Sequence, residues 1–186
     1  MMRRLFVGLV AGLIAAALGS GTLSVAASGS SQTIVGIAVS NPDFSTLVAA
    51  VSCTGLVPEL NGTAKYTVFA PTNEAFAKLG LNASNVCTAL PRATLTNILL
   101  YHVTRGTRLA KRVLPREAGE SREIRTLLAG QSFEVNHSGV ITTSSGNTST
   151  IVATNIRGSN GVSHVIDSVL IPGANSDEDG EHENDN

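Results

Sequence analysis

The segment KYTVFAPTNEAFAKL, from Lys65 to Leu79, constrains the fold of this chain more than any other part of its sequence. Tyr66, Val68 and Ala70 alternate with Thr67 and Phe69, which is the two-residue period of a strand with both faces partly covered. Pro71 then removes a backbone donor and holds the preceding residue in extended geometry. Thr72 or Asn73 can cap the helix that follows. The residues that we expect to shape this strand-to-helix corner are Thr67, Phe69, Pro71, Thr72, Asn73 and Phe76.

Helical patterns flank this corner on both sides. Asn41 can cap a helix with Pro42 in its first turn, because apolar residues recur from Phe44 to Val51 at helical spacing. A second apolar stripe runs from Leu95 to His102, and the Tyr-His-Val triplet at 101–103 reads as the start of a strand. From Arg122 onward, short apolar segments alternate with Gly, Ser and Asn, which is typical of a strand meander or sandwich. Helices first and strands later predict an α+β fold.

The segment GVSHVIDSVLI, residues 161–171, reads as a central strand because both of its faces are largely apolar. In an unbroken strand His164 points to one face, and Ser163 and Asp167 point to the other. A buried carboxylate without partners is costly, so we expect Asp167 to accept hydrogen bonds from amides, hydroxyls or a cation. We interpret His164 as a structural side chain.

The two ends of the chain differ from its middle. Arg3 and Arg4, the apolar run Leu5–Leu18 and the small residues at 24–27 form the pattern of a secretory signal peptide, so we expect residues 1–27 to be removed. The product should be secreted, or periplasmic in a Gram-negative bacterium, without a stable membrane anchor. Residues 173–186 form an acidic tail that we expect to be disordered.

Charge argues against nucleic acid as a partner. Without Arg3 and Arg4, 11 basic residues face 14 acidic ones. The basic residues crowd between 92 and 125, which indicates either a solvated face or a polyanion-binding patch. Asn-x-Ser/Thr triplets occur at Asn61, Asn82, Asn136 and Asn147, and they matter only in a eukaryotic secretory pathway.

Cys53 and Cys87 are the only cysteines of the chain. In an exported protein two cysteines most often form a disulfide, and two buried free thiols are the alternative. No cysteine and histidine pairs stand at metal-ligand spacing, so no metal site and no cofactor are expected.

Three segments in series resemble the fasciclin (FAS1) domain family: YTVFAPTNEAF, LLYHVTRG and GVSHVIDSVLIP. The resemblance spans residues 34–172. It implies a wedge-shaped β-sandwich packed with several α-helices. It also implies a secreted protein that mediates cell adhesion or interactions with an extracellular matrix or surface. Its partners would be extracellular proteins or polysaccharides.

In animal members of this family, the Tyr-His block and nearby apolar residues are linked to adhesion. The matching positions here are Tyr101 and His102, with Leu99, Leu100 and Val103 beside them. The helical stripe that ends at His102 equally favours a structural histidine. This chain holds one such domain without an internal repeat, and we expect a monomer.

Enzymatic alternatives find little support in the sequence. Ser163, His164 and Asp167 are the types of a hydrolase triad, but alternation along a strand sends His164 to the opposite face. We therefore expect a noncatalytic protein. The alternative function is that of an extracellular carrier, which would hold a small apolar ligand between the helices and the sandwich.

Overall fold

A computed structural model describes residues 32–173, and the predicted signal peptide and all but the first residue of the acidic tail lie outside this range. The helical elements are α1 (Ile34–Ser40), η1 (Pro42–Phe44), α2 (Ser45–Thr54), α3 (Val57–Leu60), α4 (Asn73–Ala77), α5 (Val86–Ala89), α6 (Arg92–Tyr101) and α7 (Ala110–Val113). The strands are β1 (Tyr66–Pro71), β2 (Val103–Arg105), β3 (Ser121–Arg125), β4 (Ser132–Asn136), β5 (Val140–Thr143), β6 (Thr148–Gly158) and β7 (Gly161–Ile166).

The predicted strand-to-helix corner is confirmed. All six residues of β1 are buried, and α4 starts two residues after Pro71. Of the two capping candidates, Thr72 is the N-cap, and its hydroxyl accepts a hydrogen bond from the amide of Ala75 at 3.3 Å. Asn73 has another task, because its side chain accepts a hydrogen bond from the amide of Thr46 at 3.0 Å. It thereby satisfies a free donor at the start of α2, whose own N-cap residue supplies no side-chain bond.

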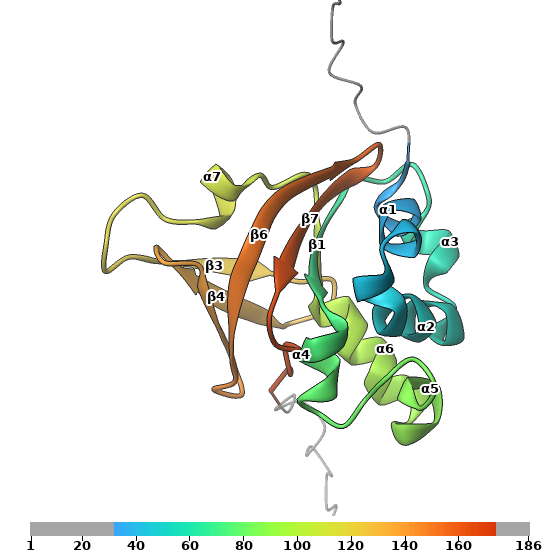
Figure 1. Cartoon of the computed structure of the whole chain (residues 1–186). Helices are drawn as coiled ribbons and strands as arrows, with labels where there is room; N and C mark the ends of the chain where they lie inside the picture. The colour runs from blue at the N-terminus through green and yellow to red at the C-terminus, as the bar shows by residue number, and fades with distance from the viewer. Residues whose placement is uncertain (1–31, 174–186) are drawn as a thin grey trace, which may run out of the picture.

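The strands follow one continuous order, β2-β1-β7-β6-β5-β4-β3. The eleven-residue strand β6 pairs with β5 through its first residues and with β7 through the rest, so it belongs to both halves of the sheet. In Figure 1, β3 and β4 lie to the left of β6, β7 and β1, while α1, α2, α3, α5 and α6 lie to their right. The expected sandwich therefore arises by bending one sheet, and helices cover one of its halves.

Two apolar cores correspond to these layers. One core lies between the helices and the half of the sheet that contains β1 and β7. The second core lies between the two halves of the sheet, where Phe69 meets Phe133 edge-to-face at 5.0 Å between ring centroids. Phe76 of α4 is buried in the first core. The α+β prediction is confirmed.

The segment 161–171 is a central strand for only half of its length. β7 lies between β1, which is parallel to it, and β6, and all its residues are buried. The strand ends at Ile166, so the expectation of an unbroken strand through Asp167 was wrong. The Asp167 carboxylate instead turns toward β6, where it accepts hydrogen bonds from the amide of Thr150 at 2.8 Å and the hydroxyl of Ser149 at 3.1 Å.

The Tyr-His-Val triplet also differs from the expectation. Tyr101 is the last residue of α6, His102 is its C-cap, and only Val103 belongs to the short strand β2. The helix continues further than expected because the amide of His102 still bonds to carbonyl oxygens one turn back, Leu99 among them at 3.1 Å.

Within residues 32–173, no single helix has the length and apolar composition to cross a membrane. The stretch from α1 through α2 meets these conditions only as a pair of helical segments, which are bent by 108°.

Candidate functional site

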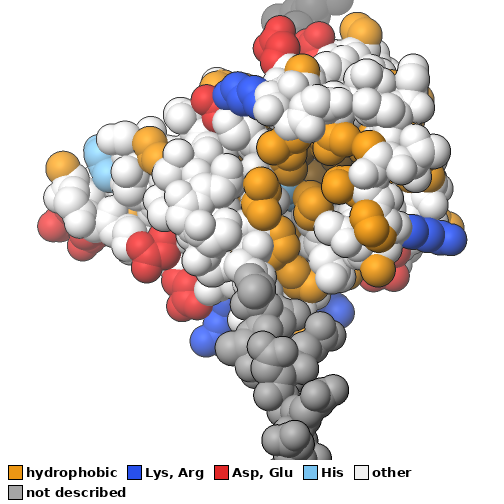
Figure 2. Space-filling model, turned by 90° about the horizontal axis from the view of Figure 1, so that it is seen from below, with side chains coloured by type: hydrophobic (Ala, Val, Ile, Leu, Met, Phe, Trp, Pro, Cys, Tyr) orange, Lys and Arg blue, Asp and Glu red, His pale blue; other side chains and the backbone are white. Residues whose placement is uncertain are grey.

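An apolar pocket of about 150 Å³ opens between the N-terminal helices and the helix-covered half of the sheet. Figure 2 shows hydrophobic side chains gathered around a hollow on the lower face of the molecule. The pocket is lined from α1, α2, α3, β1, the end of α6 and β7. No charged side chain lines it, so the pocket is suited to an uncharged apolar group.

Helix α1 forms one wall of this pocket and was not expected from the sequence. Its residues Val35 and Val39 face the pocket, and Val39 is 62% exposed at its rim. The helix starts at Ile34 because Thr33 caps it, with the hydroxyl of Thr33 accepting a hydrogen bond from the amide of Gly36 at 3.1 Å. This short helix, IVGIAVS, follows a polar stretch and was therefore missed in the sequence. The capping residue Thr33 followed by an apolar run is the pattern that could have indicated it.

The buried Asn160, in the turn between β6 and β7, fixes the position of α1. Its side-chain oxygen accepts a hydrogen bond from the amide of Ile34 at 2.9 Å. Its side-chain nitrogen donates to the carbonyl oxygens of Leu60 at 2.8 Å and Gly62 at 3.0 Å. One side chain therefore joins the start of α1, the end of α3 and the sheet around the pocket.

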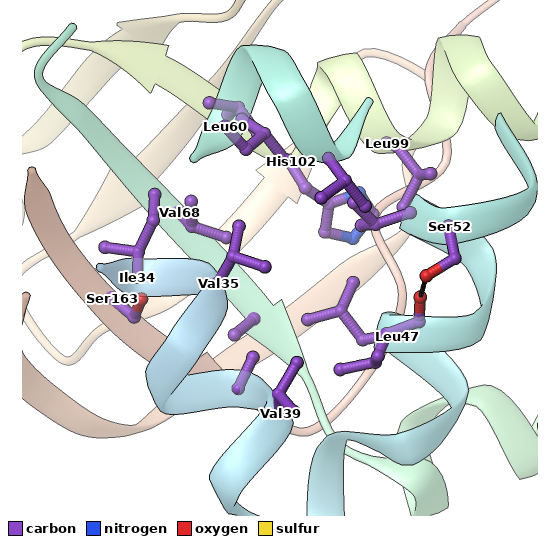
Figure 3. Close-up of a pocket in the computed structure, with 16 residues that line it drawn as sticks. Ile34, Val35, Val39, Leu47, Ser52, Leu60, Val68, Leu99, His102 and Ser163 are labelled. Carbon is purple, nitrogen blue, oxygen red and sulfur yellow. Dashed lines mark hydrogen bonds between the residues drawn. The ribbon is translucent and has the colours of Figure 1, made fainter. Parts of the chain in front are cut away.

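His102 contributes to the inner wall of the pocket, across from α1 (Figure 3). Its Nε2 accepts a hydrogen bond from the amide of Leu170 at 2.9 Å, so Nδ1 carries the proton and donates to the carbonyl oxygen of Ile98 at 2.7 Å. Burial lowers the pKa of His102 to about 4, against the opposing effect of the bond to Ile98. The imidazole is neutral at physiological pH and both of its nitrogens are occupied.

Of the five residues expected to mediate adhesion, Leu99, His102 and Val103 line the pocket. Tyr101 points away from it and is fully buried, with its hydroxyl donating to the carbonyl oxygen of Ser132 at 2.7 Å. Leu100 is partly buried. The described structure brings three of these side chains together around a cavity, and a role in adhesion stays a prediction.

Two serines bring hydroxyl groups to the pocket. The hydroxyl of Ser52 is occupied, since it donates to the carbonyl oxygen of Val48 at 2.7 Å. Ser163 on β7 is 9% exposed, and its hydroxyl has no hydrogen-bond partner among the described residues. The sequence singled out Ser163 only as a member of a triad, and nothing in the sequence alone marked it as a pocket residue.

The side chains of the three residues of that candidate triad lie in different surroundings. Ser163 faces the pocket, whereas the Nε2 of His164 donates to the carbonyl oxygen of Arg108 at 2.9 Å, and the ring of His164 lies 5.5 Å from that of Phe69. Burial lowers the pKa of His164. Burial raises the pKa of Asp167, but the bonds from Thr150 and Ser149 outweigh this effect and, with the nearby Lys78, hold that pKa below its usual value.

Other residues singled out in the sequence stabilise the fold. The hydroxyl of Thr67 donates to the carbonyl oxygen of Gly106 at 2.7 Å and fixes the loop after β2. Cys53 of α2 and Cys87 of α5 form the predicted disulfide. Between residues 32 and 173, no cluster of His, Cys, Asp or Glu side chains is arranged to hold a metal ion.

Comparison with known proteins places this geometry in a family. The Fasciclin domain matches residues 42–172. The protein sll1483 of Synechocystis is 39% identical over 156 residues, which cover 82% of this chain and 81% of that protein. Immunogenic protein MPT70 of Mycobacterium tuberculosis is 39% identical over 168 residues, covering 86% of this chain and 79% of that protein.

A solved structure shares the fold. A FAS1 domain pair from the insect cell adhesion molecule Fasciclin I superposes with a TM-score of 0.63 at 20% sequence identity, covering 76% of this chain and 51% of that one. The order of helices and strands, the three sequence blocks and the match over residues 42–172 lead to one conclusion. The chain belongs to the fasciclin domain family.

Proposed function

We propose that this protein is an extracellular, noncatalytic binding protein and that the apolar pocket is its binding site. The observation that carries the proposal is the pocket itself, an open cavity lined mainly by apolar side chains, several of which belong to the core between the helices and the sheet. Leu99, His102 and Val103, which the family resemblance marks as binding residues, form part of its wall. The resemblance and the geometry therefore favour the same region of the molecule.

The occupant that the geometry favours is a small apolar ligand, which corresponds to a carrier function. The pocket volume of about 150 Å³ is similar to that of an engineered apolar cavity known to hold benzene. A ligand that fills such a space gains mainly from the apolar area that it removes from water. Both nitrogens of His102 already have hydrogen-bond partners within the protein, so a ligand needs no polar group where it contacts that wall.

Adhesion to an extracellular protein or polysaccharide is the second candidate. It is supported by family membership and by the solved FAS1 pair, which belongs to a cell adhesion molecule. In this case the exposed Val39 and the pocket mouth would receive an apolar group of the partner. The signal-peptide pattern and the Cys53–Cys87 disulfide support an extracellular or periplasmic location for both candidates.

The proposal of a noncatalytic role follows from the state of the titratable groups. His102 has no free nitrogen with which to accept or donate a proton. His164 and Ser163 lie on neighbouring positions of β7 and contact different parts of the molecule. A general base must reach the proton that it removes, and neither histidine is placed to do so for Ser163.

Native mass spectrometry of protein isolated from its own host tests the pocket as a binding site. Ala38 lines the pocket on helix α1 and is only partly buried at the edge of the first core, so Ala38→Phe should place its ring in the cavity. Ala89→Phe, on the exposed face of α5, is the matched control. We expect the natural protein and the control to retain an apolar small molecule, and the filled variant to lose it.

The same three proteins separate the two candidates. Binding to cells or matrix that is lost in Ala38→Phe and retained in Ala89→Phe, with no small molecule in any sample, would favour adhesion. If the filled variant matches the control in both measurements, the pocket is not the binding site and the proposal fails.

A further inference from the structure

We infer that the pocket selects an uncharged, mainly hydrocarbon molecule that carries one hydroxyl or carbonyl oxygen, and that Ser163 binds this oxygen. The inference rests on the proposed function, because it requires the pocket to be a ligand site. It adds the chemical class of the ligand and the residue that recognises its single polar atom.

Ser163 occupies a position where its neighbours are apolar. Paired residues of adjacent strands point to the same face of a sheet. Val103 of β2 pairs with Val68 of β1, which pairs with Ser163 of β7, which in turn pairs with Ile156 of β6. A small hydroxyl side chain therefore stands in a row of valine and isoleucine, and three members of the row line the pocket.

The hydroxyl of Ser163 lowers the stability of the fold. It is largely buried beside apolar side chains and has no partner among the described residues, so it has lost much of its contact with water without gaining a hydrogen bond inside the protein, and its oxygen stays accessible only from the pocket. Alanine would fit this row of the sheet without that cost. A largely buried polar group that lacks a partner within the protein is a candidate for binding a ligand.

The other polar groups of the pocket wall cannot replace Ser163. The hydroxyl of Ser52 is used within α2, and both nitrogens of His102 are used within the fold. In Figure 3, Ser163 lies beside Ile34 on one side of the pocket, and His102 and Leu99 lie across from it. The polarity of the cavity is therefore one-sided, with one available hydroxyl facing an apolar wall.

The absence of charge in the lining sets the rest of the ligand class. A carboxylate, phosphate or ammonium group would be desolvated in the pocket without a counter-charge. The volume of about 150 Å³ admits a ring of benzene size or a short branched chain, and a larger molecule would extend through the mouth beside Val39. A neutral alcohol, phenol or ketone satisfies these conditions.

Phenol and toluene are matched probes for this inference, because they have similar size and differ in a hydroxyl and a methyl group. Their dissociation constants are measured by chemical-shift changes of valine and leucine methyl groups in the natural protein, Ser163→Ala and Ser163→Thr. The quantity compared is the ratio of the toluene constant to the phenol constant, which cancels general effects on the pocket.

We expect this ratio to fall roughly fivefold in Ser163→Ala, the effect of losing about one net hydrogen bond. Ser163→Thr keeps the hydroxyl in a β-branched side chain suited to a strand, so its ratio should stay within about twofold of the natural one. Thermal melts should show Ser163→Ala to be folded and at least as stable as the natural protein.

Two outcomes would contradict the inference, and they do so in different ways. If both probes bind and the ratio is unchanged in Ser163→Ala, the pocket is a ligand site and the role of Ser163 is wrong. If neither probe binds the natural protein, both the role of Ser163 and a small-molecule function of the pocket are overturned.

Discussion

His102 shows how one side chain can form part of a proposed binding pocket without offering a free hydrogen-bonding atom to a ligand. Its ring lies in the pocket wall, but its two nitrogens hold the end of α6 to the segment after β7. The sequence supported both a structural and a binding interpretation of this histidine. The structure joins the two, because His102 shapes the pocket through its ring and stabilises the fold through its nitrogens.

This arrangement predicts acid sensitivity of the fold. The pKa of His102 is about 4 in the folded protein and about 6.5 in an unfolded chain. The unfolded state therefore binds a proton between these values that the folded state cannot accept. Above pH 6.5 the free energy of unfolding should have its full value. It should fall by about 3 kcal/mol as the pH approaches 4.

Urea unfolding at pH 7 and pH 4.5 measures this loss. His102→Gln, which removes the titrating ring, should be less stable at pH 7 but should lose less stability between the two pH values. His164, whose pKa is also lowered, is present in both proteins and cancels in the comparison. Equal losses in the two proteins would show that His102 is not the source of the acid sensitivity.

At the scale of single residues, the sequence predicted the types of contact better than the partners. It predicted that Asp167 needs donors, and Thr150 and Ser149 supply them. These partners lie on a different strand, so no local pattern could have named them. The free hydroxyl of Ser163 was equally beyond reach, because whether a hydroxyl has a partner depends on packing and not on sequence spacing.

Among the elements, the parallel contact between β1 and β7 depends on a close approach of their backbones. Gly161 begins β7 opposite Tyr66, and a Cβ at Gly161 would overlap the carbonyl oxygen of Tyr66. Glycine is required here by space and not by backbone angles. The approach also brings the amide of Tyr66 to the carbonyl oxygen of Asn160 at 3.1 Å, beside the anchor of α1.

Gly161→Ala should therefore lower the free energy of unfolding by about 3 kcal/mol, the upper part of the usual range for overpacking. Gly62→Ala is the control, because a Cβ at that turn would come no closer than 3.4 Å to another atom. Urea unfolding of both variants provides the measurement. A loss in Gly161→Ala no larger than in the control would mean that the strands can separate at little cost.

The sequence predicted elements well where a cap and a long apolar period coincide. The corner of β1 and α4 is the best example, since Pro71 and Thr72 mark its boundary within two residues. Helix α1 was missed because seven residues are too few for a periodic pattern to stand out from the polar stretch before it. The end of β7 was misplaced because the bend at Asp167 is set by bonds to β6.

For the whole molecule, the disulfide is the one covalent link within the helical layer. Cys53 and Cys87 are 34 residues apart and join α2 to α5. Closing a loop of this length stabilises a fold by about 4 kcal/mol in the chain-entropy model. Cys87 is exposed, so a reductant in solution can reach the bond.

We therefore expect dithiothreitol to lower the melting temperature of the natural protein. The double variant Cys53→Ala, Cys87→Ala should melt near the temperature of the reduced natural protein, with no further effect of reductant. A natural protein whose melting is unaffected after complete reduction, confirmed by thiol titration, would show that the two helices hold together without the link.

The position of β7 between β1 and β6 has a mechanical consequence. The described part of the chain starts beside α1 and ends after β7, at opposite sides of the molecule (Figure 1). Tension applied between these two points would pull β7 along its own axis. The backbone hydrogen bonds from β7 to β1 and β6 would then be loaded in shear. A domain anchored at one end and pulled at the other would resist force through a group of bonds that must break together.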